Sequence, residues 1–224
     1  MIVALVLAAS IMAQPEPPPP PSPDVASLIA PVREALQAEQ AAQSSLPPPV
    51  DDRERIIRMG RLDQSWRQAI ANLDLSGLGS DDRRAADFAI YQLGLEADRA
   101  NLDALLEMLP ADGWFHRSVY GDEAARAAFL IIQHADLATQ ERFLPTFERL
   151  AQIGEVEPRS YAMLYDRVAV RRGRPQRYGS QMTCESGRWV PAPMETPEQV
   201  DDLRASMGME PLAANIARFQ DRPC

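Results

Sequence analysis

The chain has 224 residues, a formal net charge of −9 and 25% charged residues. Such an acidic chain is a poor partner for nucleic acid or for an anionic membrane surface, so we exclude these two partner classes. A hydrophobic content of 46% is sufficient for one domain with a true core, and a domain of roughly 200 residues buries roughly 70% of its unfolded surface.

The N-terminus carries the pattern of an export signal. Residues 1–13, MIVALVLAASIMA, contain no charge and precede a proline-rich stretch at 14–23. An apolar run of this length is too short for a bilayer, which needs about 20 residues, but it is typical of a secretory signal peptide. We therefore expect a signal peptide at 1–13, a stiff linker at 14–23, no membrane span in the mature chain, and a periplasmic or secreted protein. A buried or disordered N-terminus is the alternative.

Apolar residues recur at helical spacing through almost the whole chain. The pattern predicts helices over residues 24–44, 53–70, 81–109, 121–135, 137–152 and 159–172, then two short helices within 196–208 and 211–219. Asp136 is the expected N-cap of the helix over 137–152. Extended pieces are expected only near 178–182 or 188–190. We therefore predict a mainly α fold, in which 24–224 form a single multi-helix domain, orthogonal or bundle-like, with a short irregular C-terminal region.

The predicted helix over 121–135 is apolar on every side. Between residues 124 and 132 only Arg126 is polar, which is typical of a helix in the middle of a core. Its last residues, Gln133 and His134, are therefore expected to be enclosed by the other helices.

Three polar side chains fall on apolar stripes that should face the core: Asp98, His134 and Asp166. Burying a carboxylate without a partner is costly, so we expect these groups to meet. Histidine beside carboxylates can act as a general base, and histidine with two carboxylates can hold a divalent metal ion. A hydrogen-bond network that only fixes helix packing is the third alternative. The sequence identifies no cofactor.

The predicted catalytic residues are His134, Asp166 and Asp98. The predicted ligand-binding residues are polar or aromatic: Asn101, Trp114, Gln133, Arg167, Gln176, Tyr178 and Gln181. Amide and phenol groups both donate and accept hydrogen bonds, which suits a neutral polar ligand such as a sugar or a peptide. The sequence contains no GxSxG, HExxH, phosphate-loop or CxxC motif.

The chain has two cysteines, Cys184 and Cys224. In an oxidising compartment an even pair predicts a disulfide. Closing a loop of about 41 residues would stabilise the fold by roughly 4 kcal/mol on the chain-entropy model. Two free thiols are the alternative, and they are favoured if the chain is not exported.

Six short motifs occur in order along the chain. They are Met59-x3-Asp63-Gln64, Asp98-Arg99-Ala100-Asn101, Gly113-Trp114, Gln133-His134-Ala135-Asp136, Asp166-Arg167-Val168 and GRPQRYGSQ at 173–181. The series resembles a bacterial family, the domain of unknown function 6624 family, over about residues 54–216. Ser180 stands where the family usually has Thr, and Phe115 where it commonly has Pro. The resemblance implies no activity, but it implies that the polar residues selected by periodicity belong to a shared site.

Two functions from different classes are compatible with these patterns. The first is an exported enzyme, a hydrolase or lyase acting on envelope material, with His134 as general base or metal ligand and Asp166 or Asp98 orienting it. The second is a non-enzymatic periplasmic binding or scaffold module, in which the arginine-rich residues 171–177 form a contact surface. The expected partner is a small polar ligand in the first case and an envelope protein in the second.

Overall fold

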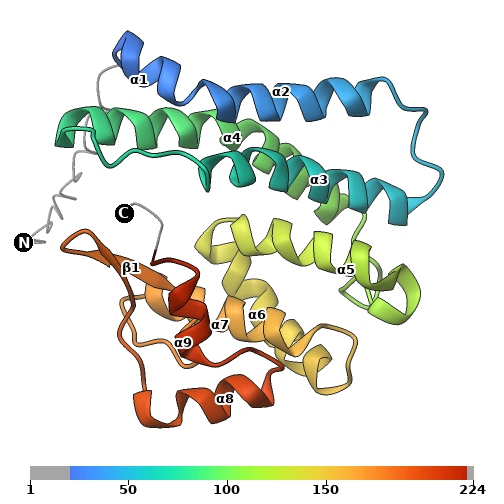
Figure 1. Ribbon diagram of the computed structural model, residues 1–224. Coiled ribbons are helices and arrows are strands. Elements are labelled where there is room, and N and C mark those ends of the chain that lie inside the picture. The colour runs from blue at the N-terminus through green and yellow to red at the C-terminus, as the bar shows by residue number, and fades with distance from the viewer. Residues whose placement is uncertain (1–20, 221–224) are drawn as a thin grey trace, which may run out of the picture.

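The computed structural model describes residues 21–220 and is mainly helical, which confirms the predicted fold class (Figure 1). Its elements in chain order are α1 (Pro23–Leu28), α2 (Ala30–Ser44), α3 (Asp52–Ile70), α4 (Ser80–Glu107), α5 (Arg117–His134), α6 (Leu137–Gln152), α7 (Pro158–Arg171), β1 (Met182–Glu185), β2 (Arg188–Pro191), η1 (Pro197–Gln199), α8 (Val200–Ser206) and α9 (Leu212–Ala217). The signal peptide at 1–13, most of the linker at 14–23, and Cys224 lie outside the described residues. The export signal and the disulfide therefore stay predictions.

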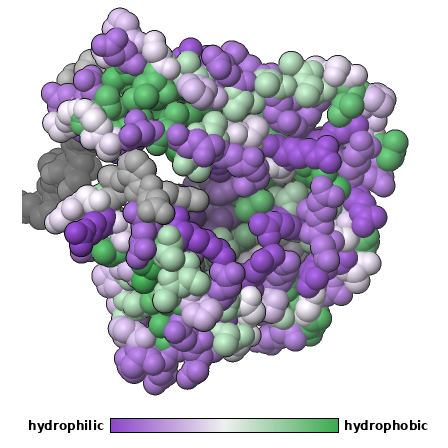
Figure 2. All heavy atoms as spheres, viewed as in Figure 1, coloured by the Kyte–Doolittle hydropathy of each residue, from purple (hydrophilic) through white to green (hydrophobic). Residues whose placement is uncertain are grey.

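The helices form two stacked groups (Figure 1). α1 and α2 lie end to end along α3 and α4, and α5 lies between this layer and the C-terminal part with α6 to α9. The space-filling view shows a hollow between the two groups, with hydrophilic residues around it (Figure 2). α3 contacts α2 on one side and α5 on another, and it contributes side chains to both apolar clusters of the described chain. α3 is therefore the central helix of the molecule.

Several helix boundaries follow from capping and proline. The carboxylate of Asp136 accepts a hydrogen bond from the amide of Thr139 at 2.7 Å, so the predicted N-cap of α6 is confirmed. The single helix expected over 24–44 is divided at Ile29 into α1 and α2. Pro31 explains the break, because a proline inside a helix lacks the amide hydrogen and its ring clashes with the preceding turn.

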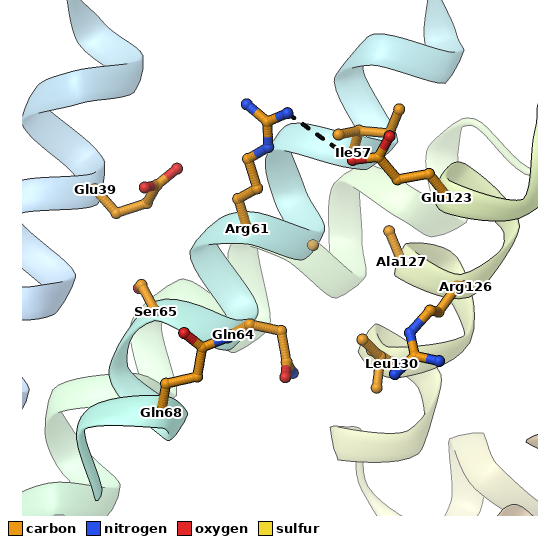
Figure 3. Close-up of a pocket in the computed structure, with 11 residues that line it drawn as sticks. Glu39, Ile57, Arg61, Gln64, Ser65, Gln68, Glu123, Arg126, Ala127 and Leu130 are labelled. Carbon is orange, nitrogen blue, oxygen red and sulfur yellow. Dashed lines mark ion pairs between the residues drawn. The ribbon is translucent and has the colours of Figure 1, made fainter. Parts of the chain in front are cut away.

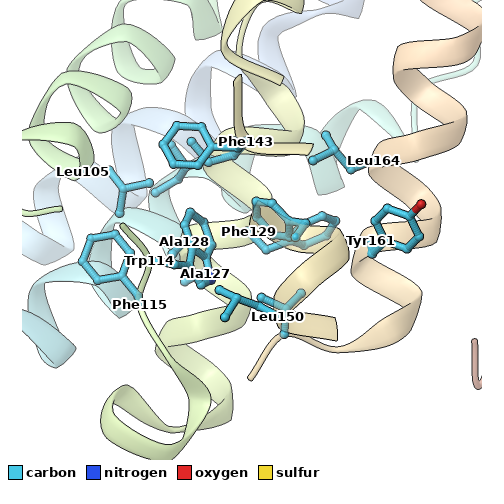
Figure 4. Close-up of a cluster of buried hydrophobic side chains, with 14 of the residues drawn as sticks. Leu105, Trp114, Phe115, Ala127, Ala128, Phe129, Phe143, Leu150, Tyr161 and Leu164 are labelled. Carbon is cyan, nitrogen blue, oxygen red and sulfur yellow. The ribbon is translucent and has the colours of Figure 1, made fainter. Parts of the chain in front are cut away.

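The prediction of an enclosed helix before residue 135 is confirmed. α5 begins at Arg117 and is interrupted by the non-helical Gly121, whose φ is 76°. Beyond this glycine its buried residues are Ala124, Ala125, Ala127, Ala128, Phe129, Ile131, Ile132 and Gln133. Figure 4 shows part of this helix surrounded by aromatic and leucine side chains of its neighbours. His134, the last residue of α5, is therefore held against the other helices.

The buried face of α4 differs from the predicted one. Periodicity places Tyr91, Leu95 and Asp98 on the core face, but Tyr91 is 54% exposed. The buried residues of α4 are Ala85, Ala86, Ile90, Gly94, Ala97, Asn101 and Leu105. A Cβ atom at Gly94 would lie 2.2 Å from the ring of Trp66, so small residues allow α4 to approach α3 closely. The predicted stripe is therefore turned towards the edge of the core.

The C-terminal region is short and mostly irregular, as predicted. β1 pairs with β2 in an antiparallel hairpin, in which Cys184 lies opposite Trp189. The two-residue turn, Ser186 and Gly187, has positive φ angles of 51° and 76°, which suits the right-handed twist of a tight hairpin. Within residues 21–220, none of the helices has the length and apolar character that a membrane crossing requires.

Candidate functional site

The imidazole ring of His134 contacts a buried carboxylate of α3. Its Nδ1 atom lies 2.9 and 3.0 Å from the two carboxylate oxygens of Asp63. Asp63 is only 2% exposed, since α3 packs closely against α5. The carboxylate that orients His134 is therefore Asp63, and not Asp98 or Asp166, the two acids that periodicity favours.

Asp63 accepts hydrogen bonds from two further side chains of its own helix. Nη1 of Arg67 lies 2.8 Å from Oδ1, and Nε2 of Gln64 lies 2.6 Å from Oδ2. Arg67 also pairs with both carboxylate oxygens of Asp98, at 3.0 and 2.6 Å. A continuous chain of polar contacts thus runs from His134 through Asp63 and Arg67 to Asp98, and it joins α5, α3 and α4.

The protonation states of the pair follow from this environment. Burial acts to raise the pKa of Asp63, but the hydrogen bond from His134 and the charge of Arg67 outweigh it, so the pKa is lowered. Burial lowers the pKa of His134, and the guanidinium groups of Arg67 and Arg167 add to this effect, against the opposing influence of Asp63. At neutral pH the carboxylate is ionised and the imidazole is neutral. A carboxylate only accepts hydrogen bonds, so Nδ1 carries the ring proton and Nε2 keeps its lone pair.

A pocket of about 260 Å³ lies beside His134, between α4, the α5–α6 turn and the end of α7. Its lining residues are Tyr91, Leu95, Asp98, Arg99, Leu102, His134, Ala135, Asp136 and Arg171. The lining combines apolar side chains with a few polar and charged groups, as in small-molecule sites. Because Nδ1 faces the buried Asp63, Nε2 is the ring nitrogen that a ligand in this pocket can reach.

Arg167, a predicted ligand-binding residue, lies within electrostatic reach of His134. Its Nε atom is buried and has no hydrogen-bond partner within the described chain, and no described carboxylate forms an ion pair with it. Burial, with the positive charges of Arg171 and Arg67, lowers the pKa of Arg167 to about 10. The guanidinium is still protonated at neutral pH, so an uncompensated positive charge lies near the imidazole.

Asp166 binds the loop after α7 and not His134. Its carboxylate accepts hydrogen bonds from the amides of Arg177, Tyr178 and Ser180 at 2.8, 3.0 and 2.9 Å. Burial raises its pKa, and these amide donors act in the opposite direction. The prediction that Asp98, His134 and Asp166 meet is therefore correct for two of the three residues. His134 and Asp98 line one pocket, whereas Asp166 holds the loop after α7.

The predicted ligand-binding residues of the loop after α7 make their contacts mainly within the protein, close to that loop. The side chain of Gln176 donates to the carbonyls of Gln181 and Ala192, both at 2.9 Å, and accepts from the amide of Gln181 at 2.8 Å. The ring of Tyr178 is buried and packs edge-on against Tyr161. The side chain of Gln181 donates to the hydroxyl of Ser180. These contacts explain why amide and phenol groups occur in this loop without a ligand.

Three further candidates are parts of the core. Asn101 donates to the carbonyl of Met59 at 3.1 Å and so ties α4 to α3. Trp114 is buried in the aromatic cluster drawn in Figure 4. Gln133 is 1% exposed, and its side-chain amide has no hydrogen-bond partner among residues 21–220. None of the three lines the pocket beside His134.

The described residues contain no set of side chains that could bind the divalent metal ion considered as an alternative. In that part of the chain no three His, Cys, Asp or Glu side chains are gathered so that they could hold a metal ion. The position between Asp63 and Asp98, where a shared cation would lie, is taken by the guanidinium of Arg67.

A larger groove of about 410 Å³ lies on another face of α3, against α2 and α5 (Figure 3). Its lining residues are Glu39, Ile57, Gly60, Arg61, Gln64, Ser65, Gln68, Glu123, Arg126, Ala127 and Leu130. This lining includes no histidine or cysteine. Its one connection to the charged network is Gln64, which donates to Asp63. Its acidic residues are Glu39 and Glu123, and Glu123 pairs with Arg61.

Asp63 and Arg67 are the site residues that the sequence-based list lacks. Asp63 does fall on the apolar stripe of its helix, one turn before Arg67, and it belongs to the first of the six motifs. A buried carboxylate followed by arginine at i+4 is a signal for an internal ion pair. Periodicity does not show which residue of another helix contacts Asp63.

A family model described as "Family of unknown function (DUF6624)" matches residues 50–222. No curated protein and no solved structure matches the chain. The match covers most of the chain, and the protein therefore belongs to the DUF6624 family, a family of unknown function.

Proposed function

We propose that this protein is an enzyme, a hydrolase or lyase acting on envelope-derived material, and that His134 is its general base. The observation that carries the proposal is the contact of Nδ1 of His134 with the buried Asp63, beside a pocket that His134 lines. A neutral imidazole can remove a proton from water, which leads to hydrolysis, or from a substrate carbon, which leads to elimination. Asp63 then stabilises the imidazolium that forms.

Arg67 and Asp98 support this chemistry indirectly. Arg67 keeps Asp63 ionised, and its second ion pair with Asp98 fixes the guanidinium. The imidazole is therefore held in one tautomer and one orientation, as a general base requires. Export from the cytoplasm is part of the proposal, and it rests on the apolar segment at 1–13.

The alternative, a non-enzymatic binding or scaffold module, has less support from the arginine-rich loop than its sequence suggests. Arg172 pairs with Glu141, and Arg177 pairs with Glu195. Arg171 donates to the carbonyl of Ala135. Two of the four arginines of this loop are therefore paired with carboxylates of the same chain, and a third is held by a backbone carbonyl.

The test uses an activated ester, p-nitrophenyl acetate, because it needs no knowledge of the natural substrate. A neutral imidazole attacks its acyl carbon, p-nitrophenolate leaves, and water then hydrolyses the acyl-imidazole to acetate. The chain has two histidines, so His116→Ala is the matched control for His134→Ala. We expect His134→Ala to lose the protein-dependent rate and His116→Ala to keep it. Equal rates in the wild type and His134→Ala would refute the proposal.

A further inference from the structure

Several arginines lie in or near the pocket beside His134, although the protein is acidic. Arg99 and Arg171 belong to its lining, and Arg167 lies within electrostatic reach of His134. The chain as a whole has a net charge of −9, so this concentration of arginines does not reflect the general surface. Arg67, the remaining arginine near the imidazole, is already paired with two carboxylates.

The acidic groups of the lining compensate these arginines only in part. Asp98 accepts both of its ion-pair contacts from Arg67. Asp136 accepts a hydrogen bond from the amide of Thr139 as the cap of α6, and its charge also interacts with that of Arg171. Within residues 21–220, Arg99, Arg167 and Arg171 have no carboxylate within ion-pair distance. This pocket therefore has donors in excess of acceptors.

Arg171 is well placed to contact a ligand. It uses Nη1 to donate to the carbonyl of Ala135 at 3.0 Å, which fixes the guanidinium at the wall that also contains His134. Its other side-chain nitrogens have no acceptor in the described chain. α4 contributes the apolar side chains of Tyr91, Leu95 and Leu102 to the lining, together with Asp98 and Arg99.

We propose that the pocket binds a small organic anion, whose acid group pairs with Arg171 and Arg99 and whose apolar body lies against the side chains of Tyr91, Leu95 and Leu102. Guanidinium groups recognise carboxylates and phosphates through two parallel hydrogen bonds, which suits an anion in this position. A volume of about 260 Å³ admits a ring or a short chain, but not a polymer. This inference rests on the proposed function and narrows its substrate class to small acids with an apolar part.

The experiment compares benzoate with benzamide, which has the same ring without the charge. Binding is followed by the NMR signal of the His134 ring, and the His116 signal serves as an internal reference. We expect benzoate to shift the His134 signal with a Kd of about 1 mM. Benzamide should bind about tenfold more weakly, since a charge-assisted hydrogen bond is lost.

Arg171→Gln and Arg174→Gln are matched variants, because both remove one exposed arginine near the end of α7. We expect Arg171→Gln to weaken benzoate about tenfold and Arg174→Gln to leave it unchanged. Equal binding of benzoate and benzamide, equal loss in the two variants, or no shift of the His134 signal would each overturn the anion site. Benzoate binding without His134-dependent ester cleavage would instead keep the anion site and refute the proposed enzyme.

Discussion

The substitution Asp63→Asn separates the two tasks of the charged network, because it removes the charge and keeps the size of the side chain. The carboxylate of Asp63 holds Nδ1 of His134 and also pairs with Arg67. An amide in its place can accept from one of these donors, but its own NH2 group then faces another. We therefore expect both the stability and the imidazole to change.

The expected loss of stability follows from the environment of Arg67. Removing one partner of a buried ion pair costs about 3–5 kcal/mol, since the other charge is left without compensation. The side chain of Arg67 is 18% exposed and keeps its two bonds to Asp98, so we expect the lower limit, about 3 kcal/mol. For a protein of this size that corresponds to a decrease in Tm of about 6–12 °C.

The imidazole should respond in the same variant. Asp63 acts to raise the pKa of His134, so its loss lowers that pKa further, and an NMR titration of the ring measures the change. An amide at position 63 can also donate to Nδ1, which places the ring proton on Nε2. In a Ser-His-Asp triad the corresponding change lowers kcat about 10⁴-fold. Ester cleavage by Asp63→Asn should therefore fall towards the His134→Ala level.

Asp98→Asn is the control for this prediction, because Asp98 pairs with Arg67 and does not touch His134. It should lower stability by less, about 1–2 kcal/mol, and keep the titration of His134 near that of the wild type. Denaturant unfolding gives the first quantity and NMR the second. If Asp63→Asn were as stable as the wild type, or if the two variants changed His134 equally, the assignment of Asp63 as its orienting partner would be refuted.

Two further predictions concern pH and close packing. The pKa of His134 is lowered in the folded state, so the unfolded chain binds the proton more readily, and the folded protein loses stability as pH falls below about 6.5. Denaturant unfolding of His134→Gln should not show this loss. Equal pH profiles of the variant and the wild type would contradict the prediction. A Cβ atom at Gly60 would lie 2.5 Å from that of Ala127, so Gly60→Ala should lower the free energy of unfolding by about 1–3 kcal/mol in the same assay. Gly77 has open space around it, and Gly77→Ala should change stability by no more than about 0.5 kcal/mol.

The helices could be predicted from the sequence because their signals are local. Apolar spacing, the cap at Asp136 and the uniform apolar run of α5 each lie within one segment. The buried face of α4 could not be predicted in the same way. Periodicity gives weight to large apolar side chains, whereas the contact with α3 is made by Gly94 and Ala97, which are buried because they are small.

The site was only partly predictable, for a related reason. Sequence can show that Asp63, Asp98 and Asp166 are carboxylates in apolar surroundings, and each therefore needs donors. It cannot show which donors they find, because histidine, arginine and backbone amides all satisfy a carboxylate. Asp63 meets His134 and Asp166 meets three loop amides, a difference that depends on how the helices are placed in space.

Asp63 and Arg67 have their hydrogen-bond partners, whereas the buried Nε atom of Arg167 has none among the described residues, and this difference bears on whether the cluster is a site or a packing device. A structural network is expected to have its donors paired throughout. Here Asp63 and Arg67 are fully engaged, whereas Arg167 has a positive charge without an acceptor, and its lowered pKa reflects about 3 kcal/mol of unfavourable environment for that charge. If the charge is retained for a ligand, Arg167→Met should raise the stability of the free protein by about 1 kcal/mol or more and weaken benzoate binding, because functional groups are kept at a cost to the fold. If unfolding experiments showed that Arg167→Met is less stable than the wild type, the guanidinium would be a structural group, and the case for a ligand in the pocket would rest on Arg99 and Arg171 alone.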